Sequence, residues 1–216
     1  MPRLPVLAFS ALLLVPAIWR FAGGWAVVSV EHLPDYAVAG KPLTLTFTVL
    51  QHGVEPLKGL RPVVEARSGR FATRATAAAG KESGQYIVSV DLPEPGDWGL
   101  TIHSGFGESR LKLLPLRAIA ASAQAPAPLT DAERGRQLFA AKGCVTCHVK
   151  DDPDSEGYLD IGPPLKGKHF EGAWLKQFLA NPASMGPARY GKGMMPNLGL
   201  KQAEIASLSA YLNDGK

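Results

Sequence analysis

Hydrophobic residues follow three different spacings along this chain. Residues 4–19 form an uncharged, leucine-rich run between Arg3 and Arg20. Between Trp25 and Arg117, hydrophobic and polar residues alternate in short runs, and after residue 129 apolar residues recur at intervals of three and four. Alternation is typical of half-buried strands, and the longer interval is typical of amphipathic helices. The pattern therefore predicts a β region followed by a helical region.

The alternation is clearest at Leu43–Leu50, where four apolar residues interleave with threonines and one more apolar residue follows. Similar short runs predict further strands at Ala26–Val30, Pro62–Ala66, Phe71–Ala77, Tyr86–Leu92, Gly99–His103 and Arg110–Pro115. Turn-forming stretches such as AGKP, RSGR and EPGD separate them. This set of short strands predicts a small antiparallel, immunoglobulin-like sandwich over residues 25–117.

The composition changes at residues 118–128, AIAASAQAPAP, which predict a semi-extended linker of alanine, proline and small polar residues. Beyond it, Thr130 and Glu133 have the spacing of a capping box. Helices are predicted within TDAERGRQLFAAKG, GAWLKQFLANP and KQAEIASLSAYLND. Because Lys201 stands where a serine or threonine cap is favourable, the third helix is expected to fray or to be capped in another way. Residues 129–216 therefore predict an all-α domain.

The first 24 residues indicate export. A basic residue precedes an apolar run whose length lies between that of a signal peptide and that of a membrane span. We expect a cleaved signal peptide or a retained N-terminal membrane anchor, with the rest of the chain in the periplasm or at the outer face of the cytoplasmic membrane. The net charge of +4 is small, which argues against a nucleic-acid partner.

Both cysteines of the chain, Cys144 and Cys147, lie in the segment GCVTCH, directly before His148. A disulfide would close too short a loop to stabilise much, and a thiol-redox site would normally follow a strand. A zinc site needs four ligands, and His169 is the only other histidine in this half. The C-x-x-C-H motif is typical of covalent haem attachment, since two thiols on one turn reach the vinyl groups of one porphyrin. The sequence thus predicts one haem c.

Four segments resemble class I (mitochondrial-type) cytochrome c, and together they cover the helical half. GRQLFAAKGCVTCH resembles the first helix and attachment site, IGPPLKG the loop that follows, GMMPNLGL the methionine loop, and EIASLSAYL the last helix. The resemblance implies that the Pro163 carbonyl accepts the Nδ1–H of His148. It also implies that Leu208 and Tyr211 cross the first helix at Gly135 and Phe139.

The resemblance further implies that His148 and Met195 are the axial ligands of the haem iron. Met195 is favoured over Met194 and Met185 because it directly precedes a proline, whereas His169 is expected to be an exposed loop residue. Two protein ligands leave no iron position for a substrate, which implies an electron carrier and not an enzyme.

We therefore expect an exported monohaem c-type cytochrome that transfers single electrons in a bacterial respiratory or photosynthetic chain. Its expected partners are redox proteins of that chain. An alternative is a fixed haem subunit of a larger membrane oxidoreductase complex. The acidic segment 150–160 is expected to be a solvated loop, with docking of a basic partner as the alternative.

The segments WAVVSVEHLPDYAVAGKPLTLTFTVLQHG and LPEPGDWGLTIHSGFG resemble YtkA-like domains, which are immunoglobulin-like units of exported bacterial proteins. That resemblance implies a fold more than an activity, and we expect the module to dock or space the haem domain. A second alternative gives it copper handling or oxidase assembly, with His32, His52 and His103 as candidate metal ligands. The basic residues between Lys58 and Arg74 are expected to form a solvated face.

Overall fold

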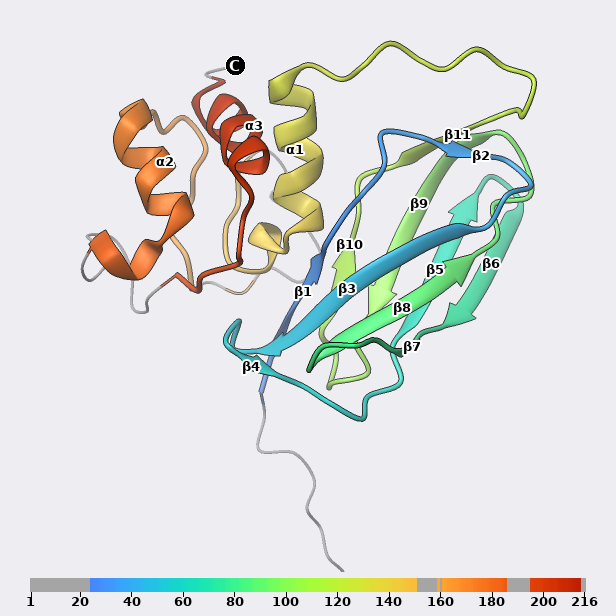
Figure 1. Ribbon diagram of the computed structural model, residues 1–216, viewed down its shortest axis with the longest axis horizontal. Helices are drawn as coiled ribbons and strands as arrows, with labels where there is room; N and C mark the ends of the chain where they lie inside the picture. The colour runs from blue at the N-terminus through green and yellow to red at the C-terminus, as the bar shows by residue number, and fades with distance from the viewer. Residues whose placement is uncertain (1–23, 151–158, 160, 186–194, 215–216) are drawn as a thin grey trace, which may run out of the picture.

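A computed structural model describes residues 24–150, 159, 161–185 and 195–214. The chain forms a β-sheet region and a helical region that lie side by side, joined by an extended stretch that passes over the top of the molecule (Figure 1). Apart from residue 24, the predicted export segment lies outside the described residues. Within the described residues, no helix is long and apolar enough to span a membrane.

The first sheet contains the strand with the clearest alternation. Its strands run in the order β1 (Ala26–Val30), β3 (Leu43–Gln51), β8 (Gln85–Val90) and β7 (Ala78–Ala79), with β4 (Glu55–Pro56) paired to β3. All pairings in this sheet are antiparallel. In β3 the apolar side chains Leu43, Leu45, Phe47 and Val49 are buried, whereas the intervening threonines are more exposed. Strand β3 therefore has the one buried face that its sequence predicts.

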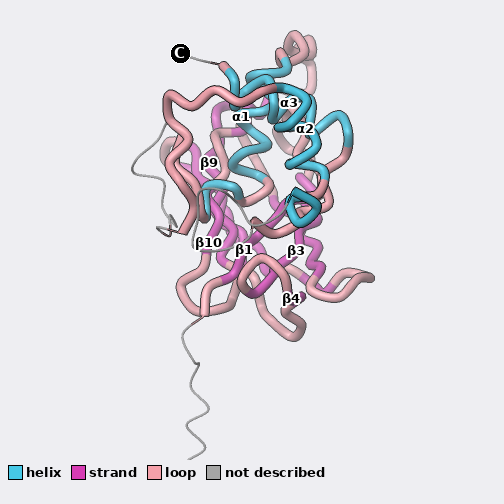
Figure 2. The backbone as a smooth tube through the Cα atoms, turned by 90° about the vertical axis from the view of Figure 1, so that its left-hand side faces the viewer, coloured by secondary structure: helices cyan, strands magenta, loops and turns pink. Residues whose placement is uncertain are grey.

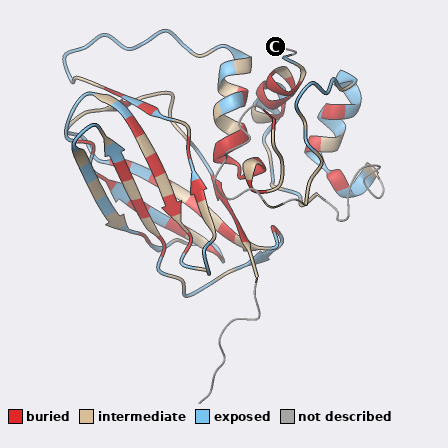
Figure 3. Cartoon of the chain, turned by 180° about the vertical axis from the view of Figure 1, so that it is seen from behind, coloured by how far each residue is buried: buried red, intermediate tan, exposed pale blue. Residues whose placement is uncertain are grey.

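The second sheet holds the remaining strands. Their order is β2 (Ala37–Val38), β11 (Leu116–Ile119), β9 (Gly96–His103), β5 (Val63–Ser68) and β6 (Phe71–Thr76), with β10 (Arg110–Lys112) paired to β9. Pairing is antiparallel except between β11 and β2, which run parallel. The first two residues of the predicted linker belong to strand β11. Residues 121–128 of the linker are exposed and form neither helix nor strand (Figure 3).

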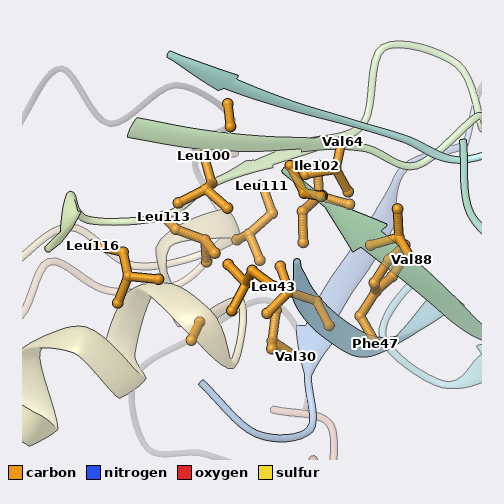
Figure 4. Packing of buried hydrophobic residues seen from close by; sticks show 14 of the residues in the cluster. Val30, Leu43, Phe47, Val64, Val88, Leu100, Ile102, Leu111, Leu113 and Leu116 are labelled. Atoms are coloured by element: carbon orange, nitrogen blue, oxygen red, sulfur yellow. The ribbon is translucent and has the colours of Figure 1, made fainter. Parts of the chain in front are cut away.

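The two sheets pack face to face around one hydrophobic core, the sheet core, in which Val30, Phe47 and Val88 meet Leu100 and Leu111 (Figure 4). Phe47 and Trp98 are fully buried. The indole N–H of Trp98 donates to the carbonyl of Glu94 at 3.0 Å, so this buried donor is satisfied. Each sheet thus buries one face against the other.

In the described part of the second region there are three helices, α1 (Asp131–Ala141), α2 (Gly172–Ala180) and α3 (Gln202–Asn213), with short 3-10 turns η1 (Cys144–Thr146) and η2 (Pro182–Met185). The predicted capping box starts α1: the Thr130 hydroxyl accepts from Glu133 N–H at 3.3 Å, and the Glu133 carboxylate accepts from Thr130 N–H at 2.8 Å. At helix α3 the Lys201 side chain makes no cap hydrogen bond, as expected for a lysine at this position, and only the reciprocal half of a capping box is present: the Glu204 carboxylate accepts from Lys201 N–H at 2.9 Å.

The cap of α1 gives a testable expectation. Replacing Thr130 by alanine is expected to lower the free energy of unfolding by about 1 kcal/mol at neutral pH, because it leaves a helix N–H without its partner. Hydrogen bonds from the Thr130 backbone and hydroxyl lower the pKa of Glu133, so the carboxylate half of the box persists above pH 4.5 and is lost as pH falls through the lowered pKa. Urea titrations of both proteins between pH 3 and 7 test this. An unchanged unfolding midpoint at neutral pH would contradict it.

Helices α1 and α3 pack directly on one another. An added Cβ at Gly135 would lie 2.6 Å from the Cβ of Tyr211 and would collide with the backbone of Ser207. One helical turn further along α1, the centroids of the Phe139 and Tyr211 rings are 5.6 Å apart. The crossing point is therefore formed by Gly135 against Ser207 and Tyr211, while Leu208 is buried in the adjacent core.

Candidate functional site

The segment after α1 places both thiols on a single turn. Gly143 adopts a left-handed conformation (φ 77°) that ends the helix. The 3-10 turn that follows brings the N–H groups of Cys147 and His148 to the carbonyl of Cys144, at 3.1 and 2.9 Å. Both cysteines are free thiols, Cys144 buried and Cys147 half-buried. The two sulfurs and the imidazole therefore belong to one compact unit.

The imidazole of His148 is held by the loop at Gly162 and Pro163. Its Nδ1 lies 2.9 Å from the Pro163 carbonyl oxygen. Because a carbonyl can only accept, Nδ1 carries the proton and Nε2 keeps its lone pair. Gly162 donates its N–H to the Cys147 carbonyl at 3.0 Å, and an added Cβ there would come within 2.6 Å of Nδ1. The loop thus fixes both the tautomer and the orientation of the ring.

The turn from Gly143 to His148, called the haem-attachment turn below, borders an apolar core to which all three helices contribute. The buried members of this helical core are Phe139, Cys144, Leu175, Leu179, Ile205, Leu208, Tyr211 and Leu212. Met195 is half-buried and packs against it, so the favoured ligand and the first thiol share one hydrophobic environment. Met185 ends η2, Met194 lies outside the described residues, and His169 is exposed.

Burial sets the protonation of the site. It raises the pKa of Cys144 to about 12, with a smaller contribution from Cys147, and it also raises the pKa of Cys147. Burial lowers the pKa of His148, and the hydrogen bond to Pro163 opposes that shift only in part. At neutral pH the thiols are therefore protonated and the imidazole is neutral. The neutral imidazole is the form of histidine that can ligate a metal.

These residues fit a covalently attached haem. Two neutral thiols lie on one turn, an imidazole has an unprotonated Nε2, and a half-buried thioether lies at the edge of an apolar core. The Nδ1 bond to the Pro163 carbonyl is the kind of outer contact that orients a ligating histidine and increases its basicity. Cys144 and Cys147 would hold the group, and His148 and Met195 would ligate its iron.

The comparisons agree with this fit. Residues 132–216 match the protein-family model described as "Cytochrome c", so the C-terminal part of the chain is a cytochrome c domain. Such a domain implies haem c and supports a haem-containing electron carrier.

No curated protein matches the chain. One similar solved structure is that of the surface layer protein SbsC, domains 1–6, at 19% identity and a TM-score of 0.33, covering 48% of this chain and 14% of that chain. A likeness this weak defines neither fold nor function.

The histidines of the β-sheet region do not form the metal site of the copper-handling alternative. His52 packs edge-on against Trp25 at 5.3 Å, and His103 lies 3.8 Å from the Glu65 carboxylate, while His32 is exposed. Among the described residues, no group of three or more His, Cys, Asp or Glu side chains is arranged to hold a metal ion.

Sequence reasoning missed two residues that support the site. Gly162 packs against the His148 ring, and its place directly before Pro163 was the available indication. Lys142 is 5% exposed, and its ammonium lies 2.7 Å from the Glu204 carboxylate of α3. Nothing in the local sequence distinguishes Lys142 from a solvated lysine, because its partner is distant along the chain.

Proposed function

We propose that this protein is an exported monohaem c-type cytochrome that carries single electrons between redox proteins of a bacterial respiratory or photosynthetic chain, and that it is not an enzyme. The observation that carries the proposal is the unit of Cys144, Cys147 and His148, with Nδ1 of the histidine committed to a carbonyl. When bound, the haem supplies reversible one-electron chemistry at iron.

The chain's own residues account for the remaining requirements. Nε2 of His148 and the thioether of Met195 would hold the iron, a pair of protein ligands that favours a high potential and leaves no position for a substrate. The apolar side chains of the helical core keep water from the site and disfavour the additional positive charge of the ferric form. This arrangement supports outer-sphere electron transfer.

We further propose that residues 1–24 direct export to the periplasm or the outer face of the cytoplasmic membrane. Residues 25–119, which include the end of strand β11, would form an immunoglobulin-like domain, residues 120–128 a linker and residues 129–216 the haem domain. The two face-to-face sheets support the immunoglobulin-like class. The alternative, a fixed subunit of a membrane oxidoreductase complex, predicts that the protein stays with membranes after washing with high salt.

The axial ligand is tested by Met195→Ala, with Met185→Ala as the matched control. Loss of the thioether is expected to abolish the long-wavelength charge-transfer band of the ferric protein and to let the ferrous protein bind carbon monoxide, because one coordination position opens. Visible spectra of both variants provide the measurement. A normal band in Met195→Ala would show that another residue is the sixth ligand, and Met194→Ala would then be the next variant to measure.

A further inference from the structure

Strand β1 is buried on both faces. Its five residues are all buried, in contrast to the alternation along β3. Val28 and Val30 point into the sheet core, whereas Val27, only 2% exposed, points away from it and does not belong to that core. Because successive strand residues face opposite sides, a second surface must cover Val27.

That surface is the haem-attachment turn together with the end of α1. Helix α1 is the helix that lies against the sheet region, at β1 and β10 (Figure 2). An added Cβ at Gly143 would lie 2.6 Å from the Val28 carbonyl oxygen and 2.7 Å from a Val27 methyl group. Ala141 is buried in the sheet core, and Val145 packs against both cores. The turn that carries Cys144 is therefore in contact with β1.

The sheet region also contacts the segment that carries the methionine. Gly53, in the turn between β3 and β4, has a left-handed conformation (φ 75°). An added Cβ there would lie 2.7 Å from the Pro196 side chain, directly after Met195. One domain thus touches both of the segments that supply ligands in the proposed haem site.

A buried lysine joins the two regions. The Lys142 ammonium donates to the Glu31 carbonyl at 3.0 Å and pairs with the Glu204 carboxylate at 2.7 Å. Because a buried charge is costly unless it is compensated, separating the regions would remove one of these two partners. Nearer the surface, Arg134 donates two hydrogen bonds to the Asp35 carboxylate, at 2.5 and 2.8 Å.

The linker does not explain this association. Residues 121–128 are exposed and have no helix or strand, so they allow the two regions to separate if the interface does not hold them. The buried contacts at β1 are of the kind found inside a domain, whereas a tethered module would keep its own solvated surface.

We propose that strand β1 is a docking surface for the haem-attachment turn, that Lys142 is the positioning residue that joins them, and that the β-sheet region and the haem domain meet redox partners as one body. The haem domain then keeps a fixed position relative to the β-sheet region and does not move independently of it on a flexible linker. The part of this proposal that concerns the haem rests on the proposed function.

The docking is tested by cutting the linker. A specific protease site inserted between Gln124 and Ala125 of the full chain allows the linker to be cut after purification. The two halves are expected to co-elute in gel filtration at about 1 μM, because the interface and not the linker holds them. Lys142→Met is expected to separate the cut halves, whereas Lys176→Met, at an exposed position on α2, is not. Separation of the unsubstituted halves would overturn the docking.

The positioning role is tested on the uncut chain by the reduction potential. Lys142→Met removes a buried positive charge and leaves the Glu204 carboxylate without its cationic partner. Both changes favour the ferric form, so the potential is expected to fall clearly more than in Lys176→Met. Equal shifts in the two variants would overturn the role of Lys142. A purified chain without covalent haem would refute the proposed function, yet elution of the cut halves would still decide the docking.

Discussion

Replacing Cys144 and Cys147 together by serine is expected to abolish covalent haem attachment and to leave the helical region largely unfolded. Both thiols lie on the same turn, and Cys144 is a buried member of the helical core. The helical region is small enough to need a covalent or metal-based constraint in order to stay folded. Each single substitution leaves one possible thioether, so its effect is expected to be partial.

The measurement is a haem-specific stain after denaturing electrophoresis, together with the intact mass and the circular dichroism at helical wavelengths. The sheet region provides an internal control, because Trp98 is fully buried in its own core and its fluorescence is expected to stay that of a buried indole. Haem that remains attached after denaturation of the double variant would refute attachment at these thiols. Loss of both the helical signal and the Trp98 environment would instead show that the sheet region cannot fold alone.

Features encoded by neighbouring residues were predictable from the sequence. The alternation at Leu43–Leu50 depends on one residue and the next, and β3 buries the expected side of it. The capping box of Thr130 and Glu133 spans one helical turn, and its two hydrogen bonds are present. The haem motif spans five residues, so its spacing already places two thiols and an imidazole on one turn.

Features that depend on distant partners were not predictable. The sequence of β1 resembles that of any apolar strand. Val27 is buried because the haem-attachment turn, which is distant along the chain, packs against it. Strand β11 continues into the alanine-rich stretch because β9 and β2 offer it hydrogen bonds. His52 follows β3 in the first sheet, whereas His103 ends β9 in the second sheet. No local sequence pattern indicates whether these two histidines come close to His32.

The helix crossing predicts the second large effect. Gly135→Ala is expected to lower the free energy of unfolding of the helical region by about 3 kcal/mol, because its Cβ would meet the backbone of Ser207 and the Cβ of Tyr211. A backbone atom cannot rotate away as a side chain can, so α3 has to shift. The Phe139–Tyr211 contact, with ring centroids 5.6 Å apart, would weaken with it.

The matched control is Gly172→Ala in the first turn of α2, where an added Cβ meets nothing within 4 Å. There alanine is expected to be neutral or to stabilise the helix by up to about 1 kcal/mol, since it lowers the entropy cost of helix formation. Guanidinium unfolding followed by circular dichroism of the haem-containing protein compares the two variants. Equal stability of both would show that helix propensity outweighs the crossing at Gly135, and that the close approach of α1 and α3 does not determine the stability of the haem domain.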